Sequence, residues 1–428
     1  MSRRLQEWGN KMSAPTLRFR EFSGDYFHKM LGSIVGCLES GVSVNSEDRP
    51  ILGEIETGIL KTSCVSDGFF NENENKKIID SEVHRAKINP IKDSILVSRM
   101  NTPMLVGEIG YVSKDYRNLF VPDRLWLIKI GDKVNNSTKW LSHQLTTKKM
   151  KALLSSIATG TSGSMKNISQ PNFLNLMVNQ PSFQEQTKIA NFLTAVDTKI
   201  SQLTKKHQLL SSYKKGVMQK IFSQELRFKD DEGREFADWE IKTLNDVVLS
   251  ITNGLSANQN ESNLGYKVTR IETISNKTID LDRVGYIDTN SDISEYKLDI
   301  GDILFSNINS LSHIGKVAFV DQEYGLYHGM NLLRLRIDKA SNAPKFIYQL
   351  LSSEKLKKSF EIKANQAVNQ ASINQTELKK TELCIPKKDE QIKIANFLTT
   401  IDDKITNVKS QLEAAKQYKQ GLLQQMFV

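Results

Sequence analysis

Two long segments of the chain carry apolar residues at alternating spacings of three and four positions. The pattern runs without a proline from Glu185 to Phe222, and again from Glu390 to Phe427. This spacing places the apolar side chains on one face of an α-helix and is typical of a coiled coil. The first predicted seam consists of Leu193, Val196, Ile200, Leu203, His207, Leu210, Lys214, Val217 and Ile221. The second consists of Leu398, Ile401, Ile405, Val408, Leu412, Ala415, Lys419, Leu422 and Met426.

The two segments are copies of one another at a constant offset of 205 positions. They share Lys-Ile-Ala-Asn-Phe-Leu-Thr, Asp-x-Lys-Ile and Tyr-Lys-x-Gly without a gap, so one structural unit is used twice. Lys214 and Lys419 occupy the same seam position, where a polar group can fix the register of a coiled coil at some cost in stability. We therefore expect the two helices to pair with each other. Two unrelated amphipathic helices, packed on separate cores, are the alternative that stays open.

The segments before the two helices contain short β-branched runs, punctuated by glycine, asparagine and aspartate, which predict strands. These runs are Ser94–Val97, Ile109–Val112 and Leu125–Ile130 in the first half, and Lys267–Ile271, Asp302–Phe305, Lys316–Val320 and Leu332–Ile337 in the second. A shorter helix is predicted ahead of each long one, at Lys139–Ser156 and at Pro344–Lys363.

At 428 residues the chain is too long for one hydrophobic core. The expected fold class is α+β: two mixed-β domains separated by two long antiparallel coiled-coil helices, with an internal pseudo-two-fold duplication. The expected boundaries are an N-terminal extension at 1–16, a first domain at 17–180, a first helical spacer at 181–225, a second domain at 226–385 and a second helical spacer at 386–428.

The composition is ordinary for a soluble globular protein. A formal net charge of +9 and a pI near 9.1 favour a polyanionic partner. Three scattered cysteines, Cys37, Cys64 and Cys384, argue against a zinc site or a disulfide framework and fit a reducing cytoplasm. No apolar run approaches the length of a membrane span and no secretory h-region is present, so a cytoplasmic location is expected.

No catalytic constellation is recognisable in the sequence. It lacks a GxxxxGK[ST] phosphate loop, a glycine-rich dinucleotide fingerprint and the Asn/Asp-Pro-Pro-aromatic tetrad of amino-methyltransferases. The six histidines show no metal-ligand spacing, and His207, on the seam, is expected to be a packing residue. We therefore expect a chain that is not an enzyme by itself and that binds no cofactor or metal.

The repeated EQxKIANFLTxxDxKI…YKxGxxQxxF, each copy preceded by a proline and by a domain skeleton with GDILFSNIN, resembles the specificity subunit of type I restriction–modification systems. The resemblance covers residues 12–428. It implies two target-recognition domains, each reading one half of a bipartite, asymmetric DNA site. It also implies that the helices set the spacer between the half-sites and dock methyltransferase subunits, expected to be two.

In that family the methyltransferase subunit carries S-adenosylmethionine and methylates adenine, while a separate restriction subunit carries ATP-driven translocation and cleavage. Whether a restriction subunit joins this chain is left open. One departure from the family pattern lies in the first half, where KDSILVSRMNT corresponds to GDILFSNINS of the second half, with Asp93 aligned on Asp302. Lys92 then replaces the glycine of the turn, and we expect the first domain to present its loop differently.

Candidate DNA-contacting residues follow from chemistry, because Lys, Arg, Ser, Thr and Asn bind phosphates while Arg, Asn and Gln read base edges. Polar residues at the predicted strand exits are Ser98, Arg99, Asn101 and Thr102, and in the second domain Ser306, Asn307, Asn309 and Ser310. A second matched pair of segments is formed by Lys61, Thr62 and Ser63 with Thr269 and Arg270. An ordinary solvated loop explains each of them equally well, and for Arg270 a pairing with Glu272 is the favoured explanation.

The candidate residues for docking a partner subunit are Lys188 and Phe192 with their repeats Lys393 and Phe397. The phenylalanines lie next to the seam, so packing against their own domain is the alternative. Two other functions stay open: an assembly adaptor that does not read DNA, and a nuclease or methyltransferase with unrecognised motifs.

Overall fold

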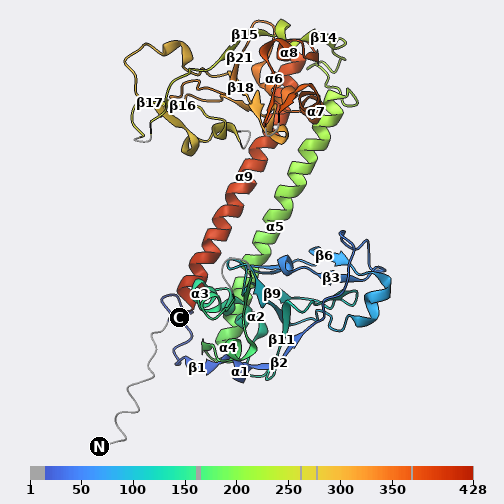
Figure 1. Cartoon of the computed structure of the whole chain (residues 1–428), viewed down its shortest axis with the longest axis vertical. Coiled ribbons are helices and arrows are strands. Elements are labelled where there is room, and N and C mark those ends of the chain that lie inside the picture. The colour runs from blue at the N-terminus through green and yellow to red at the C-terminus, as the bar shows by residue number, and fades with distance from the viewer. Residues whose placement is uncertain (1–14, 161–164, 261–262, 276–277, 368–369, 428) are drawn as a thin grey trace, which may run out of the picture. The chain divides into compact units, whose positions relative to one another are not determined.

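The computed structural model describes residues 15–160, 165–260, 263–275, 278–367 and 370–427 (Figure 1). The chain divides into two compact units. Unit 1 consists of Met1–Thr204 and Ser410–Val428, and unit 2 consists of Lys205–Lys409. Each unit therefore combines one β-rich domain with the first half of one long helix and the second half of the other. The predicted N-terminal extension falls, for residues 1–14, outside the described residues.

The two repeated segments form the long helices α5 (Phe183–Phe222) and α9 (Lys388–Met426), of 40 and 39 residues. Every predicted seam residue is buried or half-buried. In unit 1 the start of α5 and the end of α9 share one core, through Leu193 and Leu422 among others. In unit 2 the end of α5 and the start of α9 do the same. The predicted antiparallel pairing of the two helices is confirmed.

The repeated seam lysines each form an ion pair with an aspartate of the opposite helix. Lys419 Nζ lies 2.7 Å from Asp197 Oδ1 in unit 1, and Lys214 Nζ lies 2.5 Å from Asp402 Oδ1 in unit 2. The two ion pairs occupy equivalent positions in the two copies of the repeat, but they differ in burial. Side-chain exposure is 8% and 19% for the first pair, against 22% and 36% for the second.

Unit 1 contains a six-stranded sheet and three smaller sheets. The large sheet has the order β2 (Val35–Ser40), β11 (Leu125–Ile130), β7 (Ser94–Ser98), β9 (Ile109–Val112), β5 (Gly68–Phe70), β4 (Val65–Ser66). The small sheets are β10 (Leu119–Phe120)–β3 (Gly58–Leu60)–β6 (Asn75–Lys77), β1 (Phe27–Met30)–β13 (Met177–Gln180) and β8 (Met100–Asn101)–β12 (Lys166–Asn167). The helices are α1 (Leu31–Ile34), α2 (Thr138–Leu145), α3 (Lys148–Ser156) and α4 (Gln170–Leu174).

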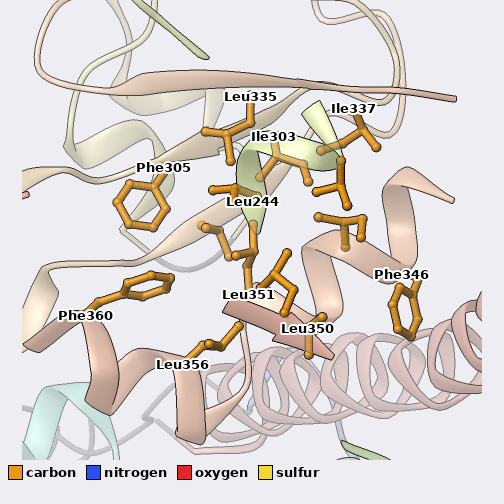
Figure 2. Packing of buried hydrophobic residues seen from close by; sticks show 14 of the residues in the cluster. Leu244, Ile303, Phe305, Leu335, Ile337, Phe346, Leu350, Leu351, Leu356 and Phe360 are labelled. Atoms are coloured by element: carbon orange, nitrogen blue, oxygen red, sulfur yellow. The ribbon is translucent and has the colours of Figure 1, made fainter. Parts of the chain in front are cut away.

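Unit 2 is built on a four-stranded antiparallel sheet in the order β15 (Val248–Asn253), β21 (Leu333–Ile337), β18 (Ile303–Phe305), β20 (Val317–Phe319). The small sheets are β16 (Tyr266–Val268)–β17 (Gly285–Ile287), β19 (Ile308–Asn309)–β23 (Gln370–Ser372)–β22 (Asn365–Ala367) and β14 (Glu240–Thr243)–β24 (Glu382–Ile385). The helices are α6 (Pro344–Leu351), α7 (Glu354–Lys363) and α8 (Gln375–Lys379). Alternate residues of β18 and β21 face α6 and α7 across the main core (Figure 2).

The prediction of one continuous helix ahead of each long helix is wrong, since both segments break in two. The break falls at Thr147 in unit 1 and at Ser353 in unit 2, where the backbone is extended. The Thr147 hydroxyl accepts a hydrogen bond from the Met150 amide, and the Ser353 hydroxyl accepts one from Leu356. Hydroxyl residues favour such caps because they satisfy amides that lack a partner in the first helical turn. The Thr-Thr and Ser-Ser pairs in the sequence mark both breaks.

The predicted alignment of Asp93 on Asp302 is wrong by one residue. The Asp93 amide donates to Val112 at 2.9 Å, and the Gly301 amide makes the equivalent bond to Val320 at 2.8 Å. Asp93 adopts a φ of +60°, and Gly301 a φ of +99°. Asp93, and not Lys92, therefore stands in place of the glycine. A short polar side chain tolerates this left-handed conformation better than most residues do.

Near the start of each long helix, a buried glutamate at the matched repeat position binds residues of the segment that enters the domain. Glu185 accepts two hydrogen bonds from Arg18, both at 2.8 Å, and one from the Tyr26 hydroxyl at 3.0 Å. Glu390 repeats this arrangement with Arg227 and with the indole of Trp239. Both carboxylates are almost fully buried. The duplication therefore extends from the helices to the segment that enters each domain.

His143 on α2 is buried beside the ion pair of unit 1, with Nδ1 3.9 Å from Asp197 Oδ2. Burial lowers the pKa of this imidazole to about 3, with the positive charges of Lys419 and Lys139 as further causes. The imidazole is therefore neutral at physiological pH. No helix in the described part of the chain is both long and apolar enough to cross a membrane.

The two ion pairs predict unequal losses for matched substitutions. Asp197→Asn leaves the Lys419 ammonium in a largely buried place and should cost about 3 kcal/mol of unfolding free energy. Asp402→Asn leaves Lys214 partly in water and should cost less than about 1 kcal/mol. Urea unfolding of the full chain measures both losses, and equal losses would contradict the role given to burial.

The buried imidazole predicts a dependence of stability on pH. Because the folded-state pKa of His143 is depressed, its stabilising contribution is complete above pH 6.5 and falls as the pH drops toward 3, where the unfolded chain binds a proton that the folded chain does not. The loss approaches about 1.4 kcal/mol for each pH unit. His143→Gln, which supplies the residue found at the matched Gln349, should remove this slope in urea unfolding across that range. Identical profiles for variant and parent would refute the assignment.

Candidate functional site

Both domains carry the same hydrogen-bonded turn at the strand exit that the sequence singled out. After β7, Asn101 Nδ2 donates to Ser98 Oγ at 3.1 Å, and Asn101 Oδ1 accepts from the next amide at 2.8 Å. After β18, Asn309 makes the same two bonds, to Ser306 Oγ at 3.1 Å and from the next amide at 2.8 Å. These side chains therefore lock a turn, and the turn is duplicated.

A glycine closes each turn from the other side. The amide of Gly107 donates to Ser98 O at 2.7 Å, and the amide of Gly315 donates to Ser306 O at 2.9 Å. Both glycines have a positive φ, of 83° and 73°. A Cβ on Gly107 would lie 2.8 Å from the Leu154 side chain, so a larger residue fits neither the space nor the backbone.

Burial divides the predicted DNA-contacting residues into two groups. The side chains with almost no exposed surface are Ser98, Asn101, Thr269, Ser306 and Asn307. The half-exposed or exposed ones are Lys61, Thr62, Ser63, Arg99, Thr102, Arg270, Asn309 and Ser310. The first group shapes the loops, as when the Thr269 hydroxyl accepts from the Gly329 amide at 3.0 Å. A contact with DNA stays a prediction for both groups, and the exposed group is the better placed to make one.

Arg99 and Asn307 occupy matched places on the two turns. The carbonyl of each accepts a hydrogen bond at 2.9 Å, from the amides of Ile168 and Ile373 respectively. The Arg99 side chain is held in place, since Nε donates to Asp123 O at 2.8 Å and the guanidinium lies over the Trp126 ring. The two domains therefore present different residue types on the same backbone frame.

The second matched pair of segments precedes a short 3-10 turn in each domain, at Thr62–Cys64 and at Glu272–Ile274. Lys61 and Ser63 share Glu74, whose carboxylate lies 3.7 Å from the ammonium and accepts from the hydroxyl at 2.7 Å. Arg270 donates to Gln259, so the expected pairing with Glu272 gives way to a different polar partner.

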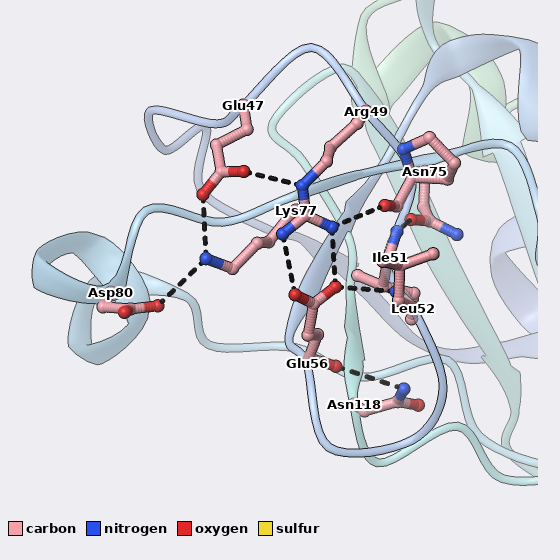
Figure 3. Close-up of polar contacts among 10 residues, drawn as sticks. Glu47, Arg49, Ile51, Leu52, Glu56, Asn75, Lys77, Asp80 and Asn118 are labelled. Atoms are coloured by element: carbon pink, nitrogen blue, oxygen red, sulfur yellow. Dashed lines mark hydrogen bonds and ion pairs between the residues drawn. The ribbon is translucent and has the colours of Figure 1, made fainter.

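An ion-pair network fastens the segment before β3 to β6 in unit 1 (Figure 3). Arg49 makes a bidentate contact with Glu56, at 2.8 and 2.7 Å, and also donates to Glu47. Lys77 on β6 bonds Glu47 at 2.8 Å and lies 3.6 Å from Asp80. The hydrogen bond from Arg49 lowers the pKa of Glu56 to about 2. The loop between β2 and β3 is therefore held in a defined conformation.

The four predicted docking residues all have partners within their own unit. Phe192 packs edge-on against Phe19, with ring centroids 5.8 Å apart, and Phe397 packs in the same way against Phe228 at 5.4 Å. The Lys188 ammonium pairs with Glu21, and Lys393 pairs with Asp231 at 2.6 Å. Packing on their own domain, the alternative left open, is thus present for both phenylalanines. Docking of a partner by these residues stays a prediction.

The exposed residues Tyr266 and Lys267 on β16, close to the predicted candidate Arg270, escaped the sequence reasoning. Tyr266 packs edge-on against Tyr327, with ring centroids 5.1 Å apart, while about two-fifths of its surface stays exposed. Lys267 and Arg270 follow it in the chain and are also exposed. Aromatic rings beside cations suit base stacking and phosphate contact. Tyr266, directly before the predicted strand Lys267–Ile271, was the available signal.

No group of three or more His, Cys, Asp and Glu side chains is placed to hold a metal ion among the residues that the structure describes.

The family model of the type I restriction modification DNA specificity domain, Methylase_S, matches this chain twice, at residues 60–211 and 237–417. Together the two matches cover more than half of the chain. The chain therefore belongs to the family of type I restriction modification DNA specificity domain proteins.

Two relatives illustrate how far the similarity extends. A protein of Methanocaldococcus jannaschii with the provisional name type I restriction enzyme MjaX specificity subunit is 44% identical over 210 residues, which cover 48% of this chain and 49% of that protein. The EcoKI specificity subunit of Escherichia coli is 24% identical over 273 residues, which cover 59% of this chain and 58% of that subunit. The chain thus spans about half the length of these curated relatives.

The fold is similar to that of a solved specificity subunit. The crystal structure of the S subunit of a type I restriction–modification system from M. genitalium superposes with a TM-score of 0.63 at 15% identity, covering 97% of this chain and 99% of that chain. The two-domain α+β architecture with paired long helices, predicted from the repeat, is confirmed.

The duplicated turn predicts a local effect of removing either asparagine. Asn101→Ala and Asn309→Ala delete the acceptor of the Thr102 or the Ser310 amide. We expect exchange of that amide with deuterium to accelerate about fivefold, since one hydrogen bond contributes roughly 1 kcal/mol. Ser310→Ala keeps both the amide and its acceptor and serves as the control. Unchanged exchange in both asparagine variants would show that other contacts hold the turn.

Proposed function

We propose that this chain is the sequence-reading specificity subunit of a type I restriction–modification complex, and that each domain reads one half of a bipartite, asymmetric DNA site. The observation that carries the proposal is the duplicated turn at Ser98–Asn101 and Ser306–Asn309, with unlike residues on equal frames. A symmetric pair of readers would suit a palindrome. Two readers that differ in their exposed residues, as at Lys61 and Arg270, suit two different half-sites.

The exposed cations provide the binding energy in this proposal. Tyr266, Lys267 and Arg270 are exposed within one short segment of unit 2, and in this proposal that segment supplies both phosphate contacts and base stacking. A side chain such as Arg99 reads guanine best, because its planar fork matches the O6 and N7 acceptors. The net charge of +9 also favours binding to a polyanion such as DNA.

The chain carries no chemistry of its own in this proposal. Its partners are double-stranded DNA, two methyltransferase subunits that methylate adenine and, in a complete system, restriction subunits with ATP-dependent endonuclease activity. Family membership supports this assignment. The similarity of the fold to that of a solved specificity subunit supports it as well.

The helices are the spacer in this proposal. An α-helix of 40 residues is about 60 Å long. That length exceeds one turn of duplex DNA, which is roughly 34–36 Å. We propose that α5 and α9 thereby set the number of unread base pairs between the half-sites, and that their outer faces dock the methyltransferase subunits.

Lengthening both helices predicts a longer spacer. Seven residues inserted after Thr204 and seven after Lys409 keep the seam pattern and add about 10 Å to each helix, which corresponds to roughly three base pairs at 3.4 Å each. The spacer of the methylated site should grow accordingly while both half-sites stay the same. An unchanged spacer in a complex that still methylates DNA would show that the helices do not set the spacer length.

Exchanging one domain predicts a change in one half-site. A chain in which residues 226–385 come from a specificity subunit of different sequence preference should keep the first half-site and acquire a new second one. Mapping the methylated sites of the hybrid complex provides the measurement. A change in both halves would contradict independent reading by the two domains.

Salt dependence separates the reader from an adaptor that does not touch DNA. A reader making several phosphate contacts loses affinity for a random-sequence duplex steeply as the salt concentration rises. An adaptor shows no such binding at any salt concentration. Incubating the purified chain with DNA, in the presence of S-adenosylmethionine or Mg²⁺, tests the remaining alternative of an unrecognised nuclease or methyltransferase.

A further inference from the structure

A cleft of about 240 Å³ lies in unit 1 between the start of α5 and the segment that leads into α2. Every residue that lines it belongs to the described part of the chain. The α2 side supplies Lys133 and Lys139, and the first turns of α5 supply Phe183 and Asn191. The two sides are joined by Gln186, whose Oε1 accepts a hydrogen bond from the amide that precedes α2 at 3.0 Å.

Unit 2 repeats this frame at the start of α6 and α9. Gln391 Oε1 accepts from the amide that precedes α6 at 2.9 Å, as Gln186 does in unit 1. The ammonium of Lys139 lies 5.8 Å from the centre of the Tyr111 ring on β9. The ammonium of Lys345, its repeat, lies 4.4 Å from the centre of the Phe319 ring on β20. The two units therefore hold matching lysines at matching places.

The segment before α2 and α6 keeps certain residues in both units while its other residues have changed. Residues 132–140 have the sequence DKVNNSTKW and residues 338–346 the sequence DKASNAPKF. The shared aspartate and asparagine hold the turn, since Asn136 Nδ2 donates to Asp132 O and Asn342 Nδ2 donates to Asp338 O. The shared lysines, Lys133 with Lys139 and Lys339 with Lys345, have no such common task in the fold.

The internal contacts of the first shared lysine differ between the units. Lys133 pairs with the Asp93 carboxylate at 2.8 Å, whereas Lys339 donates to the Ile300 carbonyl at 2.9 Å. The long helices share an asparagine beside these lysines, Asn191 on α5 and Asn396 on α9, and both are exposed. Asparagine is a poor helix former, so helix stability does not explain its presence in both copies. A contact outside the chain does explain these shared residues.

We propose that the cleft and its repeat each dock an acidic segment of one methyltransferase subunit. Lys133, Lys139 and Asn191 then bind one subunit, and Lys339, Lys345 and Asn396 bind the second. This inference rests on the proposed function, in which surfaces that read unlike half-sites differ between the units, while surfaces that bind two copies of one partner are alike. Lysines form charge-assisted hydrogen bonds with carboxylates, and an asparagine amide both donates to and accepts from a peptide backbone.

The place of the cleft in the fold favours a protein over DNA as its occupant. Asp93, which lines the cleft, directly precedes β7, and the turn at Ser98–Asn101 follows that strand. A strand of five residues is about 16 Å long. The cleft and the turn that carries the proposed reading of DNA therefore lie at opposite ends of one strand. Lysines bind phosphate as well, so the test includes duplex DNA.

Charge reversal in one unit should remove one methyltransferase subunit. The full-length chain is mixed with the methyltransferase subunit of the proposed complex, and bound subunits are counted by native mass spectrometry. We expect two for the parent, predominantly one for Lys133→Glu with Lys139→Glu, and predominantly none when Lys339→Glu and Lys345→Glu are added. Titration calorimetry should show at least a tenfold loss of affinity at each altered site. Asn191→Ala with Asn396→Ala should weaken binding about fivefold, the effect of one lost hydrogen bond per site.

The matched control is Lys148→Glu with Lys149→Glu, two exposed lysines of α3 that do not line the cleft, which should bind two subunits within twofold of the parental affinity. Thermal melting checks that each variant is folded, and the asparagine variant, which favours the helix, keeps the test valid where a lysine variant melts early. Two subunits bound at parental affinity by the cleft variants overturn the docking site and leave the proposed function standing.

Two further results would overturn the inference in other ways. A parent chain that binds no methyltransferase subunit contradicts the proposed function itself, and the docking site with it. Cleft variants that, without any partner, lose affinity for duplex DNA by the same factor as for the subunit would assign the lysines to phosphate contacts.

Discussion

A lysine ammonium on the apolar seam between two antiparallel helices requires a carboxylate on the opposite helix, and much of the structure follows from that requirement. In each unit the repeated lysine of one helix meets the repeated aspartate of the other helix across the seam, as Lys419 with Asp197 and Lys214 with Asp402. A slip of one helix against the other would leave a charge on the seam without a partner, which costs several kcal/mol where the site is dry. The ion pair therefore selects one register for the helices, and the domains are attached to helices whose register is fixed.

The duplication keeps this frame and changes what the frame carries. The buried carboxylates Glu185 and Glu390, the locked turns and the glycines behind them recur with the same hydrogen bonds in both units. The residue types on the turns differ. Such a division suits a protein that has to hold two readers in equivalent positions while each reader recognises something different.

Much of the fold was predictable from the sequence, because a repeat at a constant offset reports on helices, pairing and domain order together. The boundaries of the two long helices and several strands, among them Ile109–Val112 and Leu125–Ile130, follow directly from apolar periodicity. The breaks at Thr147 and Ser353 were not predicted. A hydroxyl cap interrupts a helix at a single residue, whereas apolar periodicity is a property of a longer segment and does not report a break at one position. The candidate site was harder to predict. Ser98 and Asn101 have the residue types of DNA contacts, yet both are buried as parts of a turn, and burial depends on tertiary packing that a linear motif does not encode.

The most direct test of the central claim is a genome-wide map of adenine methylation in cells that express this chain together with the methyltransferase subunit of the proposed complex, compared with cells that lack this chain alone. The account predicts a new methylated motif with two unlike halves separated by a fixed number of unread base pairs. A stable complex that adds no motif would contradict the claim that the chain reads DNA, and would favour an assembly adaptor. A palindromic motif would contradict the claim that the two domains read different half-sites.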